Sequence, residues 1–234
     1  MTNFSDAISS ALTLIFRLDA VLVEILTLSL SVSLSAVAIA TAIGMPVGAL
    51  LALYHFRGRF FLVVTLNAMM GLPPVVVGLI VYLLLSRSGP FGVFGLLFTP
   101  TAMIITQVLL VTPIIAALTR QIIDDLWVEY EEQMQSLGAG PGRAMPALLW
   151  DGRFTLITAI LAGFGRASAE VGGVMIVGGN IDHVTRVMTT SIALEVSKGN
   201  LSLALGLGII LLLLSVTING AAYVIQHATK RWQS

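Results

Sequence analysis

Residues 131–140, Glu-Glu-Gln-Met-Gln-Ser-Leu-Gly-Ala-Gly, lie at the centre of the one long polar stretch in this chain. The stretch spans residues 120–153 and contains nine of the chain's 12 basic and 12 acidic side chains. The chain as a whole is 57% hydrophobic and only 10% charged, with a mean hydropathy of +0.98. Soluble domains carry about 25% charged residues. The polar stretch therefore interrupts a protein that is built for lipid.

Five apolar runs are long enough to cross a bilayer, which takes roughly 20 apolar residues per helix. They cover residues 25–53, 60–85, 102–119, 154–177 and 201–226. Two shorter runs, residues 91–98 and 187–196, are expected to be re-entrant or interfacial segments. The sequence thus predicts an all-α integral membrane protein with a single domain over residues 1–234. Residues 7–16 are an alternative sixth span, although Arg17 and Asp19 interrupt it.

Charge and residue usage exclude several kinds of site. The 12 basic and 12 acidic residues cancel, so nucleic acid has no electrostatic attraction to this chain. Cysteine is absent, and the histidines His55, His183 and His227 lack metal-ligand spacing. No GxxxxGK[ST] phosphate-binding loop occurs, so any ATP hydrolysis requires another polypeptide. We therefore expect no metal, no cofactor and no enzymatic activity.

The distribution of Lys and Arg predicts the orientation in the membrane, because cytoplasmic loops carry an excess of these residues. One side holds seven of them: Arg57, Arg59, Arg120, Arg143, Arg153, Lys230 and Arg231. The other side holds four: Arg17, Arg87, Arg186 and Lys198. We expect residues 1–24 on the extracytoplasmic side, and the polar stretch and the C-terminus in the cytoplasm.

The first half of the polar stretch has the periodicity of an amphipathic helix. Trp127, Tyr130, Met134 and Leu137 are spaced three, four and three residues apart, which places them on one helical face. Gly138 and the following Gly-Pro pair would end this helix, and residues 143–150 would form a second one. The sequence predicts a helix–turn–helix elbow. Its six acids against three arginines favour a docking protein over an anionic lipid surface.

Residues 132–139 resemble the EAA loop of permease subunits in binding-protein-dependent ABC importers. Glu132, Leu137, Gly138 and Ala139 match that pattern, while Gln133 and Met134 replace its alanines and Trp150-Asp151 stands where Leu-Pro is expected. Residues 44–52, 71–78 and 165–181 are similar to core helices of the same family, the last to its oxyanion branch. The similarity covers roughly residues 22–226. The ending at residues 149–153 looks most like tungstate permeases, with molybdate permeases close behind.

The resemblance implies a five-helix type I ABC importer transmembrane domain with a cytoplasmic coupling-helix loop at residues 120–153. It implies a multi-pass protein of a prokaryotic inner membrane that passes tungstate, or alternatively molybdate or sulfate, by alternating access. Partners would be a second copy of this chain, cytoplasmic ATPase subunits, a periplasmic oxyanion-binding protein and membrane lipid. The ATPase-docking residues would be Trp127, Tyr130, Glu131, Glu132, Met134, Ser136, Leu137, Gly138 and Ala139.

Arg166 and Glu170 are the charged residues inside the fourth predicted span, one helical turn apart. A charge at the bilayer centre costs about 2.5–3.5 kcal/mol on insertion scales, so both should face protein or water. Together with Gly172 and Gly173 they are candidates to line or gate a transport path. A buried ion pair that fixes helix packing is an equally weighted alternative. Asp182, His183 and Arg186 follow at the outer end, where a solvated loop is favoured over a periplasmic contact.

Two other functions make different demands on the sequence. A gradient-driven secondary transporter predicts an internal repeat of broken helices, and the two halves of this chain show no convincing repeat. An intramembrane enzyme needs several reactive side chains that converge at membrane depth. Only Arg166 and Glu170 qualify, so both alternatives are disfavoured.

Overall fold

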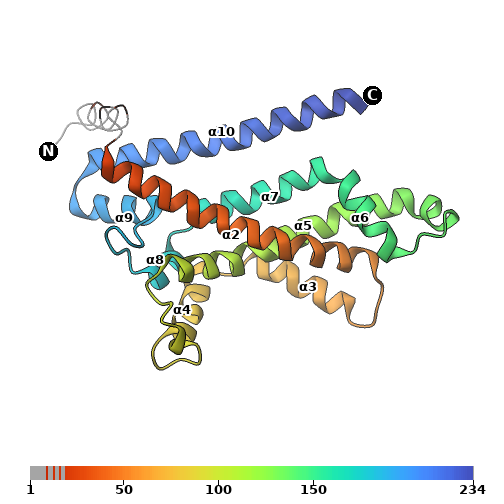
Figure 1. Cartoon of the computed structure of the whole chain (residues 1–234), viewed down its shortest axis with the longest axis horizontal. Coiled ribbons are helices and arrows are strands. Elements are labelled where there is room, and N and C mark those ends of the chain that lie inside the picture. Colours follow the sequence, from red (N-terminus) through yellow and green to blue (C-terminus); the bar gives the residue numbers. More distant parts are fainter. Residues whose placement is uncertain (1–8, 10–12, 14–15, 17–18, 234) are drawn as a thin grey trace. The chain divides into compact units, whose positions relative to one another are not determined.

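A computed structural model describes residues 9, 13, 16 and 19–233, with side chains placed up to residue 220 (Figure 1). The alternative sixth span at residues 7–16 lies mostly outside the described residues. The long helices are α2 (Ala20–Leu53), α5 (Pro100–Ser136) and α10 (Leu201–Gln233). The shorter elements are α3 (Arg59–Met70), α4 (Pro74–Leu85), η1 (Gly92–Phe94), α6 (Pro141–Asp151), α7 (Arg153–Ser168), α8 (Gly172–Gly178) and α9 (Met188–Lys198). Among the described residues every regular element is helical, which confirms the all-α prediction.

In the part of the chain that the structure describes, three helices, α2, α5 and α10, are long and apolar enough to cross a membrane unbroken. The number reaches five only if each of two bent pairs counts as one span. These pairs are α3 with α4, bent by 101°, and α6 with α7, bent by 77°. The predicted spans at residues 25–53 and 201–226 lie within α2 and α10. The third predicted span, residues 102–119, is only the first part of a helix that continues to Ser136.

The second predicted span, residues 60–85, is wrong as a single helix. It breaks after Met70, and the chain restarts as α4 at Pro74. A proline disfavours helical geometry in the residue before it, and Pro74 then occupies the first position of α4, where its missing N–H leaves no helical bond unmade. By contrast, Pro46 and Pro113 lie inside helices that continue past them.

The fourth predicted span, residues 154–177, is also interrupted. Helix α7 ends at Ser168, residues 169–171 are not helical, and α8 begins at Gly172. The short predicted segments are α9, which begins at Met188, and the 3₁₀ turn η1 within residues 91–98. Hydropathy located the apolar run at residues 154–177 but not the point where the helix breaks.

The chain folds into two compact units. Unit 1 contains residues 1–35, 73–107 and 168–218, and unit 2 contains residues 36–72, 108–167 and 219–234. The polypeptide passes from one unit to the other inside α2, α5 and α10. It also does so at the α3–α4 break and beside the α7–α8 break.

Unit 1 is held together by close contact of backbone with backbone. Helices α4 and α8 pack side by side, and a Cβ added at Gly78 would lie 2.7 Å from the Cα of Gly173. Leu22, Ile25, Met188 and Leu207 form a buried apolar cluster. The buried Ser29 hydroxyl accepts a hydrogen bond of 2.7 Å from the backbone N–H of Met188 at the start of α9.

Unit 2 is built on the approach of α2 to α5. Gly44 and Gly48, four residues apart, face α5, and a Cβ at Gly48 would lie 2.3 Å from the backbone oxygen of Ala116. Small residues at this spacing allow two membrane helices to approach closely. Toward the C-terminal end of α2, Ala49, Ala52 and Leu53 join a buried cluster with residues of α5 and α6.

Replacement of Gly48 by alanine should destabilise unit 2, because the atoms that the new Cβ meets are backbone and cannot rotate away. We expect a loss of about 1–3 kcal/mol, the usual range for overpacking. Gly165→Ala is the matched control, since a Cβ there meets nothing within 4 Å. Thermal unfolding in detergent measures both, and an unchanged midpoint for Gly48→Ala would refute the contact.

Candidate functional site

The polar stretch begins as the continuation of α5 and forms the predicted elbow. Helix α5 runs without interruption to Ser136, the chain turns at residues 137–140, and α6 leads back from Pro141 (Figure 1). Gly138 has φ +71°, a left-handed conformation that glycine adopts without a steric penalty. The backbone N–H of Ala139 donates to the oxygen of Met134 at 2.8 Å, which closes the helix end.

The apolar face of this elbow is turned into the chain itself. Trp127 is only 6% exposed and belongs to the buried cluster with Leu53 of α2 and Leu148 of α6. Tyr130 and Met134 pack against the same cluster. Sequence periodicity shows that a helical face is buried but not what covers it, which is why these three residues were predicted to meet a partner. In the structure they hold the elbow to α2 and α6.

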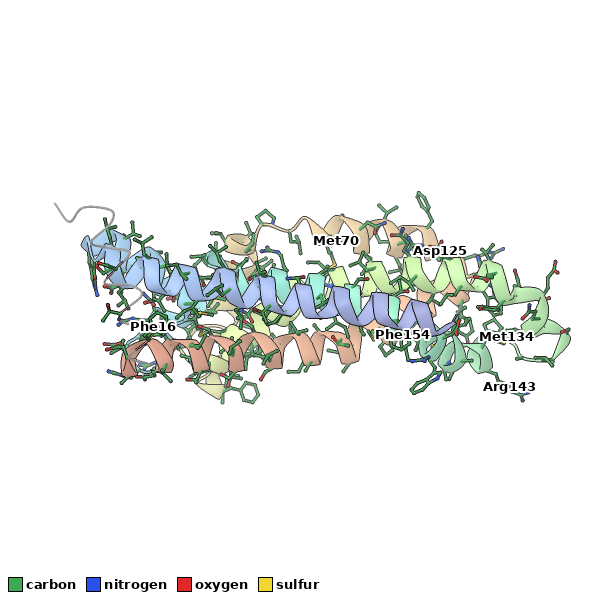
Figure 2. The ribbon with its side chains drawn as sticks, turned by 90° about the horizontal axis from the view of Figure 1, so that it is seen from above. Phe16, Met70, Asp125, Met134, Arg143 and Phe154 are labelled. Carbon is green, nitrogen blue, oxygen red and sulfur yellow. The ribbon has the colours of Figure 1, made fainter. Side chains whose placement is uncertain are left out.

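The outer rim of the elbow carries the exposed members of the predicted set. Leu137 is 81% exposed, and Glu132, Ser136 and Gly138 are exposed as well, while Glu131 and Ala139 are partly buried. Figure 2 shows the side chains of Met134 and Arg143 on the two arms of the elbow. The sequence did not single out Val128 and Trp150, which are 80% and 71% exposed on the same segment. Their exposure depends on where α6 packs, and this contact leaves no local pattern.

An ion-pair network fixes the base of the elbow. The Asp124 carboxylate lies 3.2 Å from Arg59 and 3.2 Å from Arg120. Arg59 also donates from Nε to the backbone oxygen of Leu51 at 2.7 Å and from Nη2 to that of Ala52 at 3.3 Å. One guanidinium thus caps the C-terminal end of α2 and pairs with α5. Arg59 and Asp124 are 65 residues apart in sequence, and no motif connects them.

The far end of the stretch, where the sequence departs from the Leu-Pro pattern, makes contacts of its own. The negative charge of Asp151 at the end of α6, followed by that of Glu129, raises the pKa of Tyr130 on α5. The Arg153 guanidinium lies 4.7 Å from the ring centroid of Trp150 and 4.4 Å from that of Phe154. It also donates to the backbone oxygen of Trp150 at 2.6 Å. These contacts stabilise the 77° bend between α6 and α7.

The prediction that Arg166 and Glu170 lie in one helix is wrong. Arg166 lies in the last turn of α7, in unit 2, whereas Glu170 lies in the α7–α8 break, in unit 1. Glu170 is only 4% exposed. Its Oε1 accepts a hydrogen bond of 2.9 Å from the backbone N–H of Gly173, and its backbone oxygen accepts one of 2.7 Å from Thr189. The carboxylate therefore caps the start of α8.

Gly172 and Gly173 are needed for close packing of α8 on α4. A Cβ at Gly172 would lie 2.6 Å from the side chain of Val75, and one at Gly173 would lie 2.9 Å from the backbone oxygen of Pro74. In the part of the chain that the structure describes, no cluster of three or more His, Asp or Glu side chains could hold a metal ion.

The loop between α8 and α9 is tied to the start of α2. Nδ1 of His183 lies 2.8 Å from Oε2 of Glu24, and Arg186 pairs with Asp182. The hydrogen bond with Glu24, followed by the negative charges of Glu24 and Asp182, raises the pKa of His183 above its ordinary 6.5. Protonated His183 therefore favours the folded loop.

The stability of this loop should decrease with rising pH. A raised pKa in the folded state means that the contribution of His183 is complete below about pH 6.5 and is lost as the pH passes the higher folded value. Thermal unfolding between about pH 6 and pH 9 measures this. His183→Asn, which accommodates the local φ of +58°, should flatten the pH course. An identical pH course for the His183→Asn protein would contradict the role of the contact.

Comparison with known proteins decides the family. The model of the family described as "Binding-protein-dependent transport system inner membrane component" matches residues 44–231. The chain belongs to this family. The matched region contains the elbow, both helix breaks and the α2–α5 contact.

Three relatives of this permease cover most of its length. The tungstate uptake system permease protein TupB of Peptoclostridium acidaminophilum is 39% identical over 227 residues, which is 97% of this chain and 100% of that protein. A probable anion ABC transporter permease protein of Haloferax volcanii is 39% identical over 203 residues, or 85% and 88% of the two chains. TupB of Campylobacter jejuni is 36% identical over 178 residues, or 76% and 73%.

The family membership confirms the predicted class of the protein. This permease is a multi-pass membrane component of an ABC importer and not an enzyme. The system to which it belongs also contains a binding protein and an ATPase as separate subunits. A gradient-driven secondary transporter and an intramembrane enzyme are both excluded.

Proposed function

We propose that this permease carries a tetrahedral oxyanion, first of all tungstate, from an extracytoplasmic binding protein into the cytoplasm. The observation that supports the substrate is the 39% identity with a tungstate uptake permease over 97% of this chain and the whole of that protein. Molybdate and sulfate have the same tetrahedral shape and charge, and they are the alternatives. The permease acts as a homodimer with two ATPase subunits, its N-terminus outside and its C-terminus in the cytoplasm.

The substrate is tested by competition in whole cells. In a strain without its own tungstate and molybdate uptake, the importer encoded with this permease should restore tungstate accumulation. Unlabelled tungstate should suppress that uptake at lower concentrations than molybdate, and sulfate should have no effect. Titration of the purified binding protein with the three anions gives an independent measure, because the receptor first selects the substrate. Suppression by sulfate at the lowest concentration would overturn the tungstate assignment.

We further propose that the ATPase docks on the exposed rim of the elbow. Glu131, Glu132, Ser136, Leu137, Gly138 and Ala139 form this rim, and Trp127, Tyr130 and Met134 position it from the inside. Because α5 is continuous from Pro100 to Ser136, a push on the rim acts directly on a helix that enters the membrane. Arg59 and Asp124 connect the same push to α2.

The rim and the buried face should respond differently to mutation. Leu137→Ser should weaken ATPase binding by about tenfold, as loss of an exposed apolar anchor does. The matched control is Val128→Ser. The side chain of Val128 lies on the same segment and is 80% exposed, compared with 81% for Leu137. Trp127→Ala should instead lower the stability of unit 2 by about 3–5 kcal/mol, because it leaves a cavity in a buried cluster.

Titration of labelled ATPase against the purified permease measures binding, and thermal unfolding measures stability. Equal weakening by Leu137→Ser and Val128→Ser would remove the rim from the docking surface. Replacement of Gly138 by valine adds a test of coupling, since a φ of +71° strains any β-branched residue and reshapes the turn. It should uncouple ATP hydrolysis from receptor-stimulated uptake.

We also propose that Arg166, in unit 2, and Glu170, Gly172 and Gly173, in unit 1, line or gate the transport path. Arg166 offers the positive charge that an oxyanion needs. The Glu170 carboxylate accepts a hydrogen bond from the Gly173 N–H. Its negative charge repels an anionic substrate from the start of α8. This combination supports brief passage of the substrate over tight binding. The alternative, that these residues only fix helix packing, has support from the close α4–α8 contact.

A further inference from the structure

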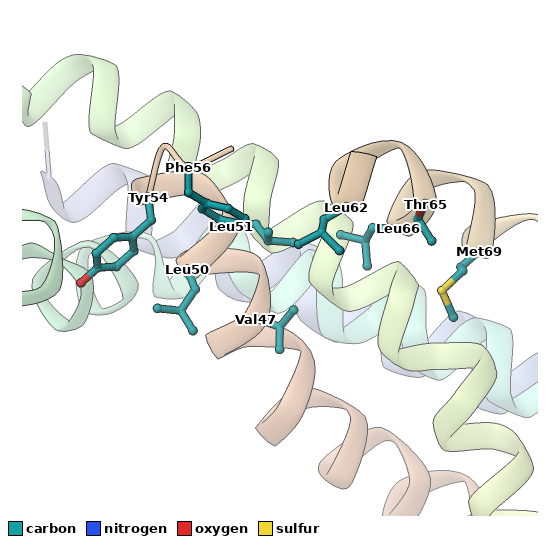
Figure 3. A pocket seen from close by; sticks show the side chains of 9 residues that line it. All are labelled: Val47, Leu50, Leu51, Tyr54, Phe56, Leu62, Thr65, Leu66 and Met69. Atoms are coloured by element: carbon teal, nitrogen blue, oxygen red, sulfur yellow. The ribbon is translucent and has the colours of Figure 1, made fainter. Parts of the chain in front are cut away.

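An open apolar groove runs between α2 and α3 in unit 2. Its volume is about 620 Å³, and Figure 3 shows the side chains that line it. Val47 and Leu50 come from α2, Leu66 and Met69 from α3, and Tyr54 and Phe56 from the connecting loop. The Thr65 and Tyr54 hydroxyls are the only polar side-chain groups among the lining residues. The wall therefore offers hydrocarbon to whatever fills it.

The groove is open to the surroundings of the protein. Helix α3 contains no buried residue, and its Phe60 and Phe61 are 82% and 71% exposed. Val47 and Leu62 are 39% and 45% exposed. Both helices belong to the apolar part of the chain, where an open apolar surface faces acyl chains or another protein.

One end of the groove is aromatic and positively charged. The loop after α2 reads Tyr54-His55-Phe56-Arg57, and all four residues are exposed. Arg57 makes no ion pair with any described residue, whereas Arg59 is engaged by Asp124. No Asp or Glu occurs between residues 25 and 123 of the sequence. Aromatic rings with a free cation at the end of an apolar groove are the features that bind an anionic lipid at the membrane–water interface.

A second copy of this chain fits this groove poorly. A two-fold contact centred on the groove would bring its charged end from both copies together. The charged end of each groove carries Arg57 and His55, and this part of the sequence has no acid to pair with them. Like charges brought together in this way oppose association. A phospholipid phosphate instead supplies the missing negative charge.

We propose that the groove is a binding site for one anionic phospholipid. An acyl chain lies along Leu50, Leu66 and Met69, and the phosphate meets Arg57 and His55. The bound chain fills the space between α2 and α3 next to the Arg59–Asp124 network, so the lipid stabilises the base of the elbow. The site is independent of which oxyanion is transported.

The chain contains no cysteine, so a single cysteine introduced into the groove can be labelled selectively. Thr65→Cys, carrying a fluorophore, is placed in phosphatidylcholine nanodiscs with a small fraction of lipid bearing a mid-chain nitroxide. Nitroxide-labelled phosphatidylglycerol should quench the label at about fivefold lower mole fraction than labelled phosphatidylcholine, the preference expected from one arginine at the surface. Leu212→Cys is the control, since it is 68% exposed on α10 and lies far in sequence from any basic residue. There the two lipids should quench equally.

Two further measurements decide between a lipid and the other occupants. Arg57→Gln should abolish the preference for phosphatidylglycerol at residue 65 without loss of stability, because Arg57 makes no ion pair with a described residue. Arg87→Gln, also exposed, should preserve the preference. Equal quenching by both lipids at residue 65, or a preference that survives Arg57→Gln, would overturn the proposal. Efficient joining of two Thr65→Cys chains by a bifunctional thiol reagent would also overturn it and assign the groove to a second copy.

Discussion

Every backbone N–H and C=O of a chain in hydrocarbon needs a partner, and this constraint shapes each helix end in the permease. The four N-terminal N–H groups and four C-terminal C=O groups of a helix have no partner within it. Arg59 donates to the last carbonyls of α2, and the Glu170 carboxylate accepts a hydrogen bond from the first turn of α8. The Thr185 hydroxyl donates to the oxygen of Gly178 at the end of α8. Side chains only three to eight residues away in sequence thus supply partners for these helix ends.

This constraint connects the helix ends to the site. The guanidinium that caps α2 is the same group that pairs with Asp124 at the base of the elbow. The cap and the ion pair stabilise each other, because either contact alone restricts the side chain that makes the other. The elbow therefore stands on a fixed point at the end of α2. The packing of Trp127 against Leu148 gives it a second one on α6.

Sequence reasoning identified what depends on composition and local period. The apolar runs gave the membrane class, and Gly138 with Pro141 gave the turn between two helices. It failed at residues 154–177, because hydropathy does not distinguish one long helix from two helices joined by a buried capping carboxylate. Sequence reasoning also predicted that Trp127 contacts a partner protein, whereas Trp127 is buried inside this chain. The Leu53 and Leu148 side chains that cover it lie 74 and 21 residues away in sequence. Contacts of this kind leave no periodic signal.

The buried face of the elbow and its exposed rim have different physical tasks. A lever must be stiff, and the packing of Trp127 against α2 and α6 supplies this stiffness. The proposed docking surface must be accessible, and Leu137 and Glu132 on the rim are exposed. If the same apolar residues served both, the partner would have to pull them from the core at every cycle. If the ATPase docks on the rim as proposed, the division between inside and rim lets it move the permease without unfolding any part of it.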